Sequence, residues 1–366
     1  MRDFLVRVEN KAYPVIVCSS LFSSHEWLKQ IQFPSRKGVI ITNTTVGPLY
    51  AEKVKKLFAE EKFDLSVVVV PDGEEYKELA TAAEIYHELL RVECDRTSFL
   101  IALGGGVITD ITGFVASTYM RGIPYFQFPT SLLAQVDSSI GGKTGVNLSE
   151  GKNLVGTFYQ PEGVFIGLDF LETLPEREYV EGWSEIAKAA FLRGGDFLAL
   201  LSPNVHSILA RDPVILEELV FRSVHFKKGI VEEDEKEKGI RGILNYGHTL
   251  GHALEKTSGY GVLRHGEAIS VGMMGAILIA EKMGYVSGDT VEMQKEILEK
   301  LGLPVTVPYA VDREQLVQTL LKDKKTVARS IRLVLLKDFG DPIYGVPVEF
   351  ETVFAILPAL IEEGPS

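Results

Sequence analysis

Phe99-Leu-Ile-Ala-Leu-Gly-Gly-Gly-Val-Ile-Thr-Asp110 joins an apolar run to a triple glycine and then to a helical pattern that continues to Tyr119. A strand, a glycine turn and a helix N-terminus together form an anion site, because backbone N–H groups and the helix dipole face the bound group. The turn lacks the Gly-x-Gly-x-x-Gly order and does not follow the first strand, so a tight connection without a ligand is an equal alternative. Asp110 adds an acid that can orient its neighbours or meet a ribose.

The upstream run Pro71-Asp-Gly-Glu-Glu-Tyr-Lys77 also follows the end of an expected strand. Open parallel sheets bind nucleotides at the carboxyl ends of their strands, which favours a cofactor role for this run as well. A solvated loop explains the run equally well when it is considered alone.

Short β-rich runs alternate with amphipathic helical segments through the first half of the chain. Continuous apolar runs between helices predict a mostly parallel, doubly wound sheet. The expected strands are 4–8, 15–17, 39–42, 66–70, 99–103, 125–128 and 164–168, and the expected helices include 47–62 and 79–92.

After about residue 173 the periodicity becomes helical. The expected helices are 181–192, 214–233, 246–257, 266–283 and 289–301, with one small strand at 331–336. The sequence therefore predicts an N-terminal α/β domain, 1–172, and a mainly α-helical C-terminal domain, 173–366.

The composition is that of a globular enzyme and limits the partners. Of the 366 residues, 46% are hydrophobic and 24% charged, and the net charge is −12. Nucleic acid or an anionic membrane would need a basic face. The two cysteines lack metal or redox spacing, the charged N-terminus does not resemble a signal peptide, and no apolar run reaches transmembrane length. We therefore expect a soluble, cytoplasmic protein.

Three of the seven histidines fall within residues 245–267. His248 and His252 are four apart in a helical segment and so lie on one face, and His265 follows a glycine-rich break. Imidazoles that can converge predict a divalent metal site, although helix histidines with ordinary hydrogen bonds are the alternative.

Glycines stand next to both His248 and His252. Gly247 and Gly251 stand beside the two imidazoles, which indicates that another segment approaches the helix closely. Thr249 occupies the position of the glutamate in His-Glu-x-x-His, which argues against a zinc protease.

Two further runs, Gly141-Gly-Lys-Thr-Gly-Val-Asn147 and Gly151-Lys-Asn-Leu-Val-Gly156, place lysines among glycines. They do not meet the P-loop order, so a nucleotide hydrolase is rejected. They predict a cradle for an anionic small molecule, although solvated loop lysines are the alternative. Other basic residues stand beside unusual motifs and can contribute: Arg121, Lys188, Lys227 and Arg241.

Glu185 and Lys188 are three residues apart in a helical segment. The spacing suits a metal-binding carboxylate beside a substrate-binding ammonium. A surface ion pair explains the two residues if they are considered alone.

Taken together, these motifs resemble the 3-dehydroquinate synthase family. The resemblance is collinear from about residue 70 to residue 340, and it also covers Tyr119-Met-Arg-Gly122, residues 129–139, residues 244–255 and His265-Gly-Glu267. It implies a Rossmann-like N-terminal domain, a helical C-terminal domain, an active site in the cleft between them, and a homodimer.

The family's reaction converts 3-deoxy-D-arabino-heptulosonate 7-phosphate to 3-dehydroquinate and phosphate. The resemblance implies a tightly held NAD and a divalent metal, zinc or cobalt. One alcohol is transiently oxidised, phosphate is eliminated, the ketone is reduced again, and an intramolecular aldol closes the ring.

The resemblance also assigns roles to individual residues. The implied metal ligands are Glu185, His248 and His265, which leaves His252 to contact substrate. The implied substrate contacts are Arg121, which can come from the neighbouring subunit, Lys143, Lys152, Asn153, Lys188, Lys227, Arg241, Asn245, His252 and Lys324 or Lys325. The implied cofactor contacts are Asn43, Asp72, Glu74, Lys77, Gly105, Gly106, Val107, Asp110, Thr130, Ser131, Asp137, Lys143, Lys152 and Thr173.

Three other interpretations are weighed against this one. Another sugar-phosphate cyclase would share the metal and NAD motifs, but Lys227, Arg241 and the Asp323-Lys-Lys run favour the synthase. A metal-dependent polyol dehydrogenase would lack the two glycine–lysine runs, since it needs no phosphate cradle. An inactive metal-binding scaffold would not need the full set of side chains.

Overall fold

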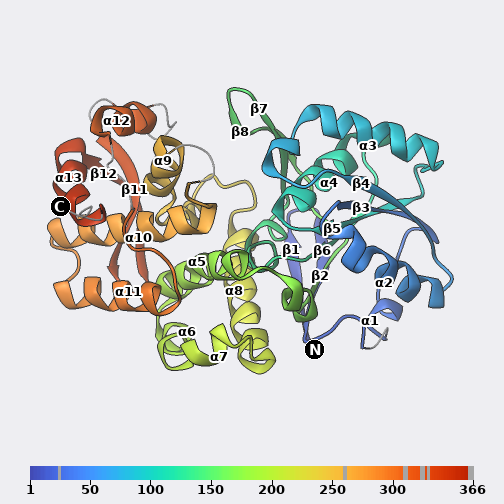
Figure 1. Cartoon of the computed structure of the whole chain (residues 1–366), viewed down its shortest axis with the longest axis horizontal. Helices are drawn as coiled ribbons and strands as arrows, with labels where there is room; N and C mark the ends of the chain where they lie inside the picture. Colours follow the sequence, from blue (N-terminus) through green and yellow to red (C-terminus); the bar gives the residue numbers. More distant parts are fainter. Residues whose placement is uncertain (24–25, 259–261, 308–311, 322–325, 328–329, 362–366) are drawn as a thin grey trace. The chain divides into compact units, whose positions relative to one another are not determined.

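The chain forms two compact units (Figure 1). The structure, a computed structural model, describes residues 1–23, 26–258, 262–307, 312–321, 326–327 and 330–361. Unit 1 comprises Met1–Pro175 with Leu216–Lys236, and unit 2 comprises Glu176–Ile215 with Glu237–Ser366. The expected division at 172/173 differs in two ways: the break follows Pro175, and a segment expected in the C-terminal domain belongs to unit 1.

Helix α8 (Pro213–Glu233) explains the second difference. Its side chains make specific contacts with the N-terminal strand β1 (Arg2–Val8). The Phe221 ring lies edge-on to Phe4 with centroids 5.6 Å apart, and Glu218 pairs with Arg2 at 2.6 Å. The residues in contact lie far apart in the sequence, so the helical periodicity of residues 214–233 does not predict that these contacts form.

Unit 1 is built on a seven-stranded sheet of order β1-β2-β9-β6-β5-β3-β4. Only the β1–β2 edge pair is antiparallel, and the remaining pairs are parallel. The other strands are β2 (Lys11–Cys18), β3 (Lys37–Asn43), β4 (Asp64–Val70), β5 (Phe99–Gly104), β6 (Tyr125–Pro129) and β9 (Gly163–Gly167). The expected doubly wound α/β fold is confirmed, and each expected strand in the first half overlaps an observed one.

Helices cover both faces of this sheet, and alternate residues of its buried strands therefore enter two different cores. In β5, Ile101 and Leu103 join one core with residues of α2, and Leu100 and Ala102 join the other with residues of α3 and α4. Besides most of α8, the described helices of unit 1 are α1 (Glu26–Lys29), α2 (Gly47–Glu60), α3 (Leu79–Arg91) and α4 (Gly106–Thr118). Burial on both faces is why the strands are continuously apolar.

The sheet reverses its winding between β3 and β5, since β4 lies on one side of β3 and β5 on the other. Ligands of doubly wound sheets bind outside the carboxyl ends of the strands at such a reversal. The triple-glycine turn follows β5 at this point and leads directly into α4.

A separate hairpin, β7 (Lys143–Leu148) and β8 (Gly151–Phe158), extends from the sheet of unit 1 (Figure 1). The sequence had predicted no strands here, and loop lysines were the alternative to an anion cradle. The glycines are required by close strand approach: a Cβ on Gly156 would lie 2.0 Å from the Thr144 carbonyl oxygen, and one on Gly145 would lie 2.8 Å from that of Val155. Here glycine permits pairing rather than flexibility.

Unit 2 is mainly helical, as expected. Besides the N-terminal end of α8, its helices are α5 (Glu176–Arg193), α6 (Gly195–Ala199), α7 (Val205–Leu209), α9 (His248–Ser258), α10 (His265–Lys282), α11 (Gly288–Lys300), α12 (Arg313–Leu321) and α13 (Phe350–Ile356).

Unit 2 also holds a three-stranded antiparallel sheet, β10 (Thr326–Val327), β11 (Ser330–Asp338) and β12 (Asp341–Glu349). The sequence had predicted only a small strand at 331–336. Pro342 and Pro347 hid β12, but an edge strand tolerates proline because one side of its backbone donates no ladder hydrogen bonds.

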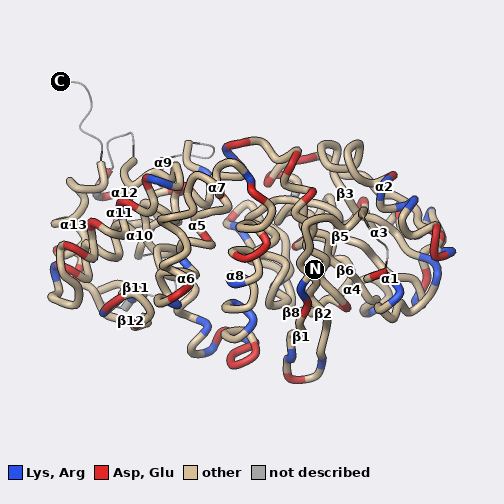
Figure 2. The backbone as a smooth tube through the Cα atoms, turned by 90° about the horizontal axis from the view of Figure 1, so that it is seen from below, with Lys and Arg blue, Asp and Glu red and all other residues tan. Residues whose placement is uncertain are grey.

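Acidic and basic residues are interspersed along both units (Figure 2). Among the described residues, no helix combines the length and the apolar character needed to cross a bilayer.

Candidate functional site

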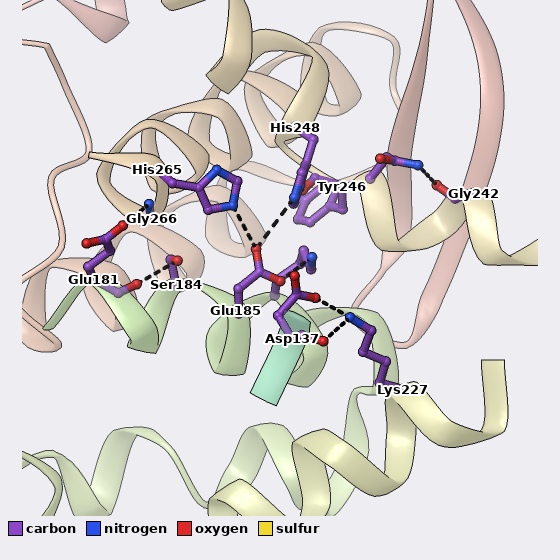
Figure 3. Close-up of polar contacts among 12 residues, drawn as sticks. Asp137, Glu181, Ser184, Glu185, Lys227, Gly242, Tyr246, His248, His265 and Gly266 are labelled. Atoms are coloured by element: carbon purple, nitrogen blue, oxygen red, sulfur yellow. Dashed lines mark hydrogen bonds and ion pairs between the residues drawn. The ribbon is translucent and has the colours of Figure 1, made fainter. Parts of the chain in front are cut away.

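Unit 2 gathers the predicted metal ligands from three helices (Figure 3). Glu185 lies on α5, His248 begins α9 and His265 begins α10. Glu185 Oε1 lies 3.6 Å from His248 Nε2 and 3.8 Å from His265 Nε2. A tetrahedral ion with bonds of about 2.0–2.1 Å would separate its ligand atoms by about 3.3 Å, so small movements would let these three atoms share one ion.

Glycines let the three helices approach this closely. A Cβ on Gly251 would lie 2.7 Å from the Ala268 carbonyl oxygen of α10, and one on Gly272 would lie 2.0 Å from the Gly247 carbonyl oxygen. A Cβ on Gly266, next to His265, would lie 2.2 Å from the Glu181 carbonyl oxygen of α5. The close approach expected beside the α9 imidazoles is confirmed, and the approaching segment is α10.

His252 belongs to the same cluster. Ligand atoms of His248, His252 and His265 lie within 4.8 Å of one another. The His252 ring centroid is 5.3 Å from that of His248 and 5.6 Å from that of His265. His252 is exposed, whereas Glu185 is 3% exposed. The geometry therefore offers two ligand sets, three imidazoles or two imidazoles with a carboxylate.

The surroundings of His248 keep its imidazole neutral. Burial is the main cause of a pKa well below the usual 6.5, and the positive charge of Lys188 and the other two imidazoles lower it further. Nδ1 lies 3.2 Å from the Tyr246 carbonyl oxygen, which can only accept. The proton therefore belongs on Nδ1, and Nε2 presents a lone pair toward Glu185. A neutral imidazole held from behind in this way is the form that binds metals.

Lys188 and Glu185 form a buried pair one turn apart on α5. Lys188 contacts Oε2, and Oε1 is the oxygen nearest the two imidazoles. Both side chains are nearly fully buried, so the pair is not a surface ion pair. The donor set of two nitrogens and one carboxylate oxygen fits a catalytic zinc-type ion.

Two expected substrate residues precede α9 in a short 3₁₀ segment, Ile240–Asn245. Arg241 is 2% exposed, and Asn245 Nδ2 donates to Glu237 Oε1 at 2.9 Å. A buried guanidinium in an acidic protein suits recognition of a carboxylate or phosphate.

Unit 1 places the expected cofactor residues at the carboxyl ends of neighbouring strands. After β3, Asn43 donates to Asp72, which follows β4, at 2.6 Å. After β6, the Thr130 N–H donates to the Gly104 carbonyl, and Ser131 Oγ lies 3.4 Å from the Cβ position of Gly105. Gly106 and Val107 begin α4 beside this turn.

A lysine network adjoins the same edge. Lys77, which is 4% exposed, donates from Nζ to Asp110 Oδ2 at 2.5 Å and to Asn153 Oδ1 at 2.7 Å. Burial raises the pKa of Asp110, against the opposing attraction of Lys77. Glu74, an expected cofactor contact, accepts from Asn147 at 2.8 Å.

Lys227, on α8, reaches a second acid of unit 1. Its Nζ lies 2.5 Å from Asp137 Oδ1 and 2.7 Å from the Asp137 carbonyl oxygen (Figure 3). An expected substrate residue and an expected cofactor residue, 90 positions apart, thus contact each other. Thr173 Oγ1 lies 2.6 Å from the Tyr50 hydroxyl of α2. Tyr50 was not anticipated because no local motif marks it, and Asn147 stood in one of the glycine–lysine runs but was assigned no role.

The remaining expected site residues are exposed or lie outside the description. Arg121, Lys143 and Lys152 are exposed on unit 1. Arg121 and the preceding Met120 have φ of 73° and 49°, a left-handed backbone that non-glycine residues rarely adopt. Lys324 and Lys325 lie outside the described residues.

Similarity to known proteins extends over residues of both units. A family model described as the N-terminal part of 3-dehydroquinate synthase matches residues 67–181, and one described as its C-terminal part matches residues 182–326. The 3-dehydroquinate synthase of Thermodesulfovibrio yellowstonii is 47% identical over 306 residues, which cover 84% of this chain and 85% of that protein.

Two solved structures share the fold at 26% identity. A 2-deoxy-scyllo-inosose synthase complexed with carbaglucose-6-phosphate, NAD+ and Co2+ aligns with a TM-score of 0.89 over 97% of this chain and 99% of its own. A 2-epi-5-epi-valiolone synthase from Streptomyces hygroscopicus subsp. jinggangensis with NAD+ and Zn2+ aligns with a TM-score of 0.88 over 97% of this chain and 98% of its own.

Proposed function

This chain belongs to the 3-dehydroquinate synthase family, and on that premise we propose how its residues carry out the synthase reaction. The resemblance drawn from the motifs is confirmed. The reaction converts 3-deoxy-D-arabino-heptulosonate 7-phosphate to 3-dehydroquinate and phosphate through oxidation, phosphate elimination, reduction and aldol closure.

Glu185, His248 and His265 hold a divalent metal in this proposal. When bound, such an ion holds two substrate oxygens and polarises the hydroxyl that is oxidised. The Tyr246 carbonyl fixes the tautomer of His248, and Lys188 fixes the Glu185 carboxylate from its other oxygen. The Co2+ or Zn2+ bound in the two cyclase structures supports the presence of a divalent metal.

His252 contacts substrate in this proposal and is not a metal ligand. It is the exposed member of the histidine cluster, one helical turn beyond His248. An imidazole at this distance can accept or donate a proton at a substrate oxygen without serving as a ligand.

The residues after β3, β4, β5 and β6 hold NAD. When bound, NAD accepts a hydride from one alcohol carbon and returns it in the same turnover, so it is not consumed. The helix dipole of α4 and the open backbone at Gly105 and Gly106 suit a pyrophosphate, and Asp110 and Lys77 lie beside them.

Cationic side chains bind the two anionic ends of the substrate. Lys188 and Arg241 are buried in unit 2 and Lys227 is buried in unit 1. Lys143 and Lys152 are exposed on the hairpin, where a phosphate can reach them. Lys188 and Lys227, which contact Glu185 and Asp137, can exchange part of that contact for a substrate carboxylate or phosphate.

The observation that carries this proposal is the convergence of Glu185 with His248 and His265 in a chain of this family. The test is release of phosphate from the heptulosonate phosphate, with the product identified by mass and NMR and NADH absorbance followed in parallel. We expect 3-dehydroquinate and phosphate in equal amounts without NADH accumulation. Chelation should stop turnover, and zinc or cobalt should restore it.

Other outcomes would identify the competing activities. A steady rise in NADH with a simple polyol and no phosphate release would indicate a polyol dehydrogenase. Turnover of a different heptose or hexose phosphate in preference to this substrate would indicate another sugar-phosphate cyclase.

We also propose that the protein is a cytoplasmic homodimer in which Arg121 serves the partner's phosphate pocket. Its exposure and its left-handed backbone support this role. Light scattering should give twice the 40.5 kDa chain mass, and a monomer that is fully active would contradict the assignment of Arg121.

A further inference from the structure

One side chain, Asn147, ties the β7–β8 hairpin to residues 74–77. Its Nδ2 donates to Glu74 Oε1 at 2.8 Å, and its Oδ1 accepts the backbone N–H of Asn153 at 2.8 Å. Its own backbone N–H donates to the Lys77 carbonyl at 2.7 Å. The amide orientation is settled by these partners, because a backbone N–H only donates and a carboxylate only accepts.

The hairpin is irregular at this residue. Val146 pairs with Val155 and Leu148 pairs with Gly151, so Asn147 alone faces residues 152–154. The extra residues leave the ladder as a bulge, a feature that often aims side chains at a functional site. Within the bulge, Asn153 has φ of 56°, a left-handed conformation that needs support in a residue with a Cβ.

Two hydrogen bonds provide that support, one with Asn147 of the facing strand and one with Lys77 of the expected cofactor segment. Asn147 accepts its backbone N–H, and Lys77 donates to its side-chain oxygen at 2.7 Å. Lys77 in turn contacts Asp110. Most residues of β8 are exposed, and a two-stranded hairpin has little stability of its own, so these contacts decide the conformation of the bulge.

We propose that Asn147 is a positioning residue that couples cofactor binding to substrate binding. This rests on the proposed function, in which residues 74–77 contact NAD and Lys152 and Asn153 contact substrate. Cofactor at Glu74 and Lys77 holds Asn147, and Asn147 holds the bulge so that Lys152 and Asn153 face the substrate. Coupling of this kind is reciprocal, so bound substrate also tightens the cofactor.

Amide hydrogen exchange over residues 143–158 tests the first half of the coupling with NAD alone. In the unaltered protein, NAD should slow exchange of the Asn153 amide by roughly 5-fold or more. Asn147→Ala should abolish that protection. Ser149→Ala is the matched control, because Ser149 lies in the same hairpin turn and its hydroxyl bonds its neighbour Glu150. Equal protection by NAD in Asn147→Ala and in the unaltered protein would overturn the proposal.

The second half is tested with the phosphonate in which a methylene replaces the ester oxygen at C7, so that phosphate cannot leave. The readout is the NAD dissociation constant with and without saturating phosphonate. We expect roughly 5-fold or greater tightening in the unaltered protein, lost in Asn147→Ala. In turnover, KM for the heptulosonate phosphate should rise more than kcat falls. A coupling that survives Asn147→Ala would refute the role.

A swapped pair separates positioning from folding. Asn147→Asp keeps a side-chain oxygen that accepts the Asn153 N–H, but it places a second carboxylate against that of Glu74, so the hydrogen bond between these two side chains is lost. Adding Glu74→Gln supplies an amide at position 74 that donates to the new carboxylate at position 147, so the hydrogen bond is restored in the opposite direction. Coupling should be lost in the single variant and regained in the double variant, whether or not Asn147→Ala folds; a double variant that folds without regained coupling would contradict the proposal.

The proposed function and this inference can fail separately. If the unaltered protein releases no phosphate from the heptulosonate phosphate, the proposed function is wrong. The exchange measurement needs no substrate and still decides whether Asn147 links the cofactor segment to the hairpin.

Discussion

Replacing His248 by alanine should deprive the protein of its divalent metal, and replacing His252 should not. Glu185 Oε1 lies 3.6 Å and 3.8 Å from the Nε2 atoms of His248 and His265, close to the separation of about 3.3 Å between ligands of tetrahedral zinc. His248 is further held by the Tyr246 carbonyl, whereas His252 is exposed.

The magnitude follows from the position of each residue. Loss of a group that only orients a ligand weakens metal binding by about 10–100-fold. Loss of a ligand itself should exceed that, so His248→Ala should weaken zinc binding by more than about 100-fold, or about 2.8 kcal/mol at 1.4 kcal/mol per tenfold. His252→Ala should stay within about 10-fold, because it alters only the surroundings of the ion.

Competition between the purified protein and a chromophoric chelator would measure these affinities. Glu185→Gln belongs in the same series, because it keeps the side-chain shape while removing the charge that a metal prefers. Circular dichroism of the metal-free variants would exclude unfolding as the cause of metal loss. Equal losses in His248→Ala and His252→Ala, with Glu185→Gln unaffected, would show that the three imidazoles form the site and that our ligand assignment is wrong.

Three further predictions concern stability and are read from thermal midpoints. Gly272→Ala should destabilise unit 2 by about 3 kcal/mol or more, because the added Cβ would lie 2.0 Å from the Gly247 carbonyl oxygen, just before α9. Gly229→Ala has open space at its Cβ and should stabilise the protein by up to about 1 kcal/mol. Similar thermal midpoints for the two variants would contradict this packing. Partial desolvation of the His225 imidazole and the positive charge of Lys228 lower its pKa below 6.5, so its contribution to stability is present above pH 6.5 and is lost as the pH falls toward the lower folded-state value. His225→Phe should therefore flatten the fall in midpoint between about pH 7.5 and about pH 5, and an unchanged pH dependence would rule this out. Lys77→Met should cost about 3 kcal/mol by leaving Asp110 without its lysine, and adding Asp110→Asn should recover part of the loss; no recovery would mean that the damage is not electrostatic.

Local sequence was a sound guide wherever one segment carried the whole signal. The strand, glycine turn and helix at residues 99–118 lie where the pattern placed them, because both faces of β5 are buried and the following helix begins at the glycines. The α9 histidines share a face because helical spacing requires it.

Local sequence misled where glycine or proline served packing. The hairpin around Gly145 and Gly156 was not predicted, because a glycine-rich run does not look like a strand, yet these glycines allow two strands to approach. Pro342 and Pro347 concealed β12 because proline in a run argues against a strand. The strand forms nevertheless because β12 is an edge strand, where proline is tolerated.

By itself, the sequence determined most of the elements, the two-part organisation and the kinds of side chain expected for metal, dinucleotide and anions, since these depend on neighbours a few positions apart. Only the tertiary structure decided that α8 returns to unit 1, that Lys227 meets Asp137, and that Asn147 joins the hairpin to Glu74. The last two contacts join residues 90 and 73 positions apart, and packing of whole elements, not local pattern, brings such residues together.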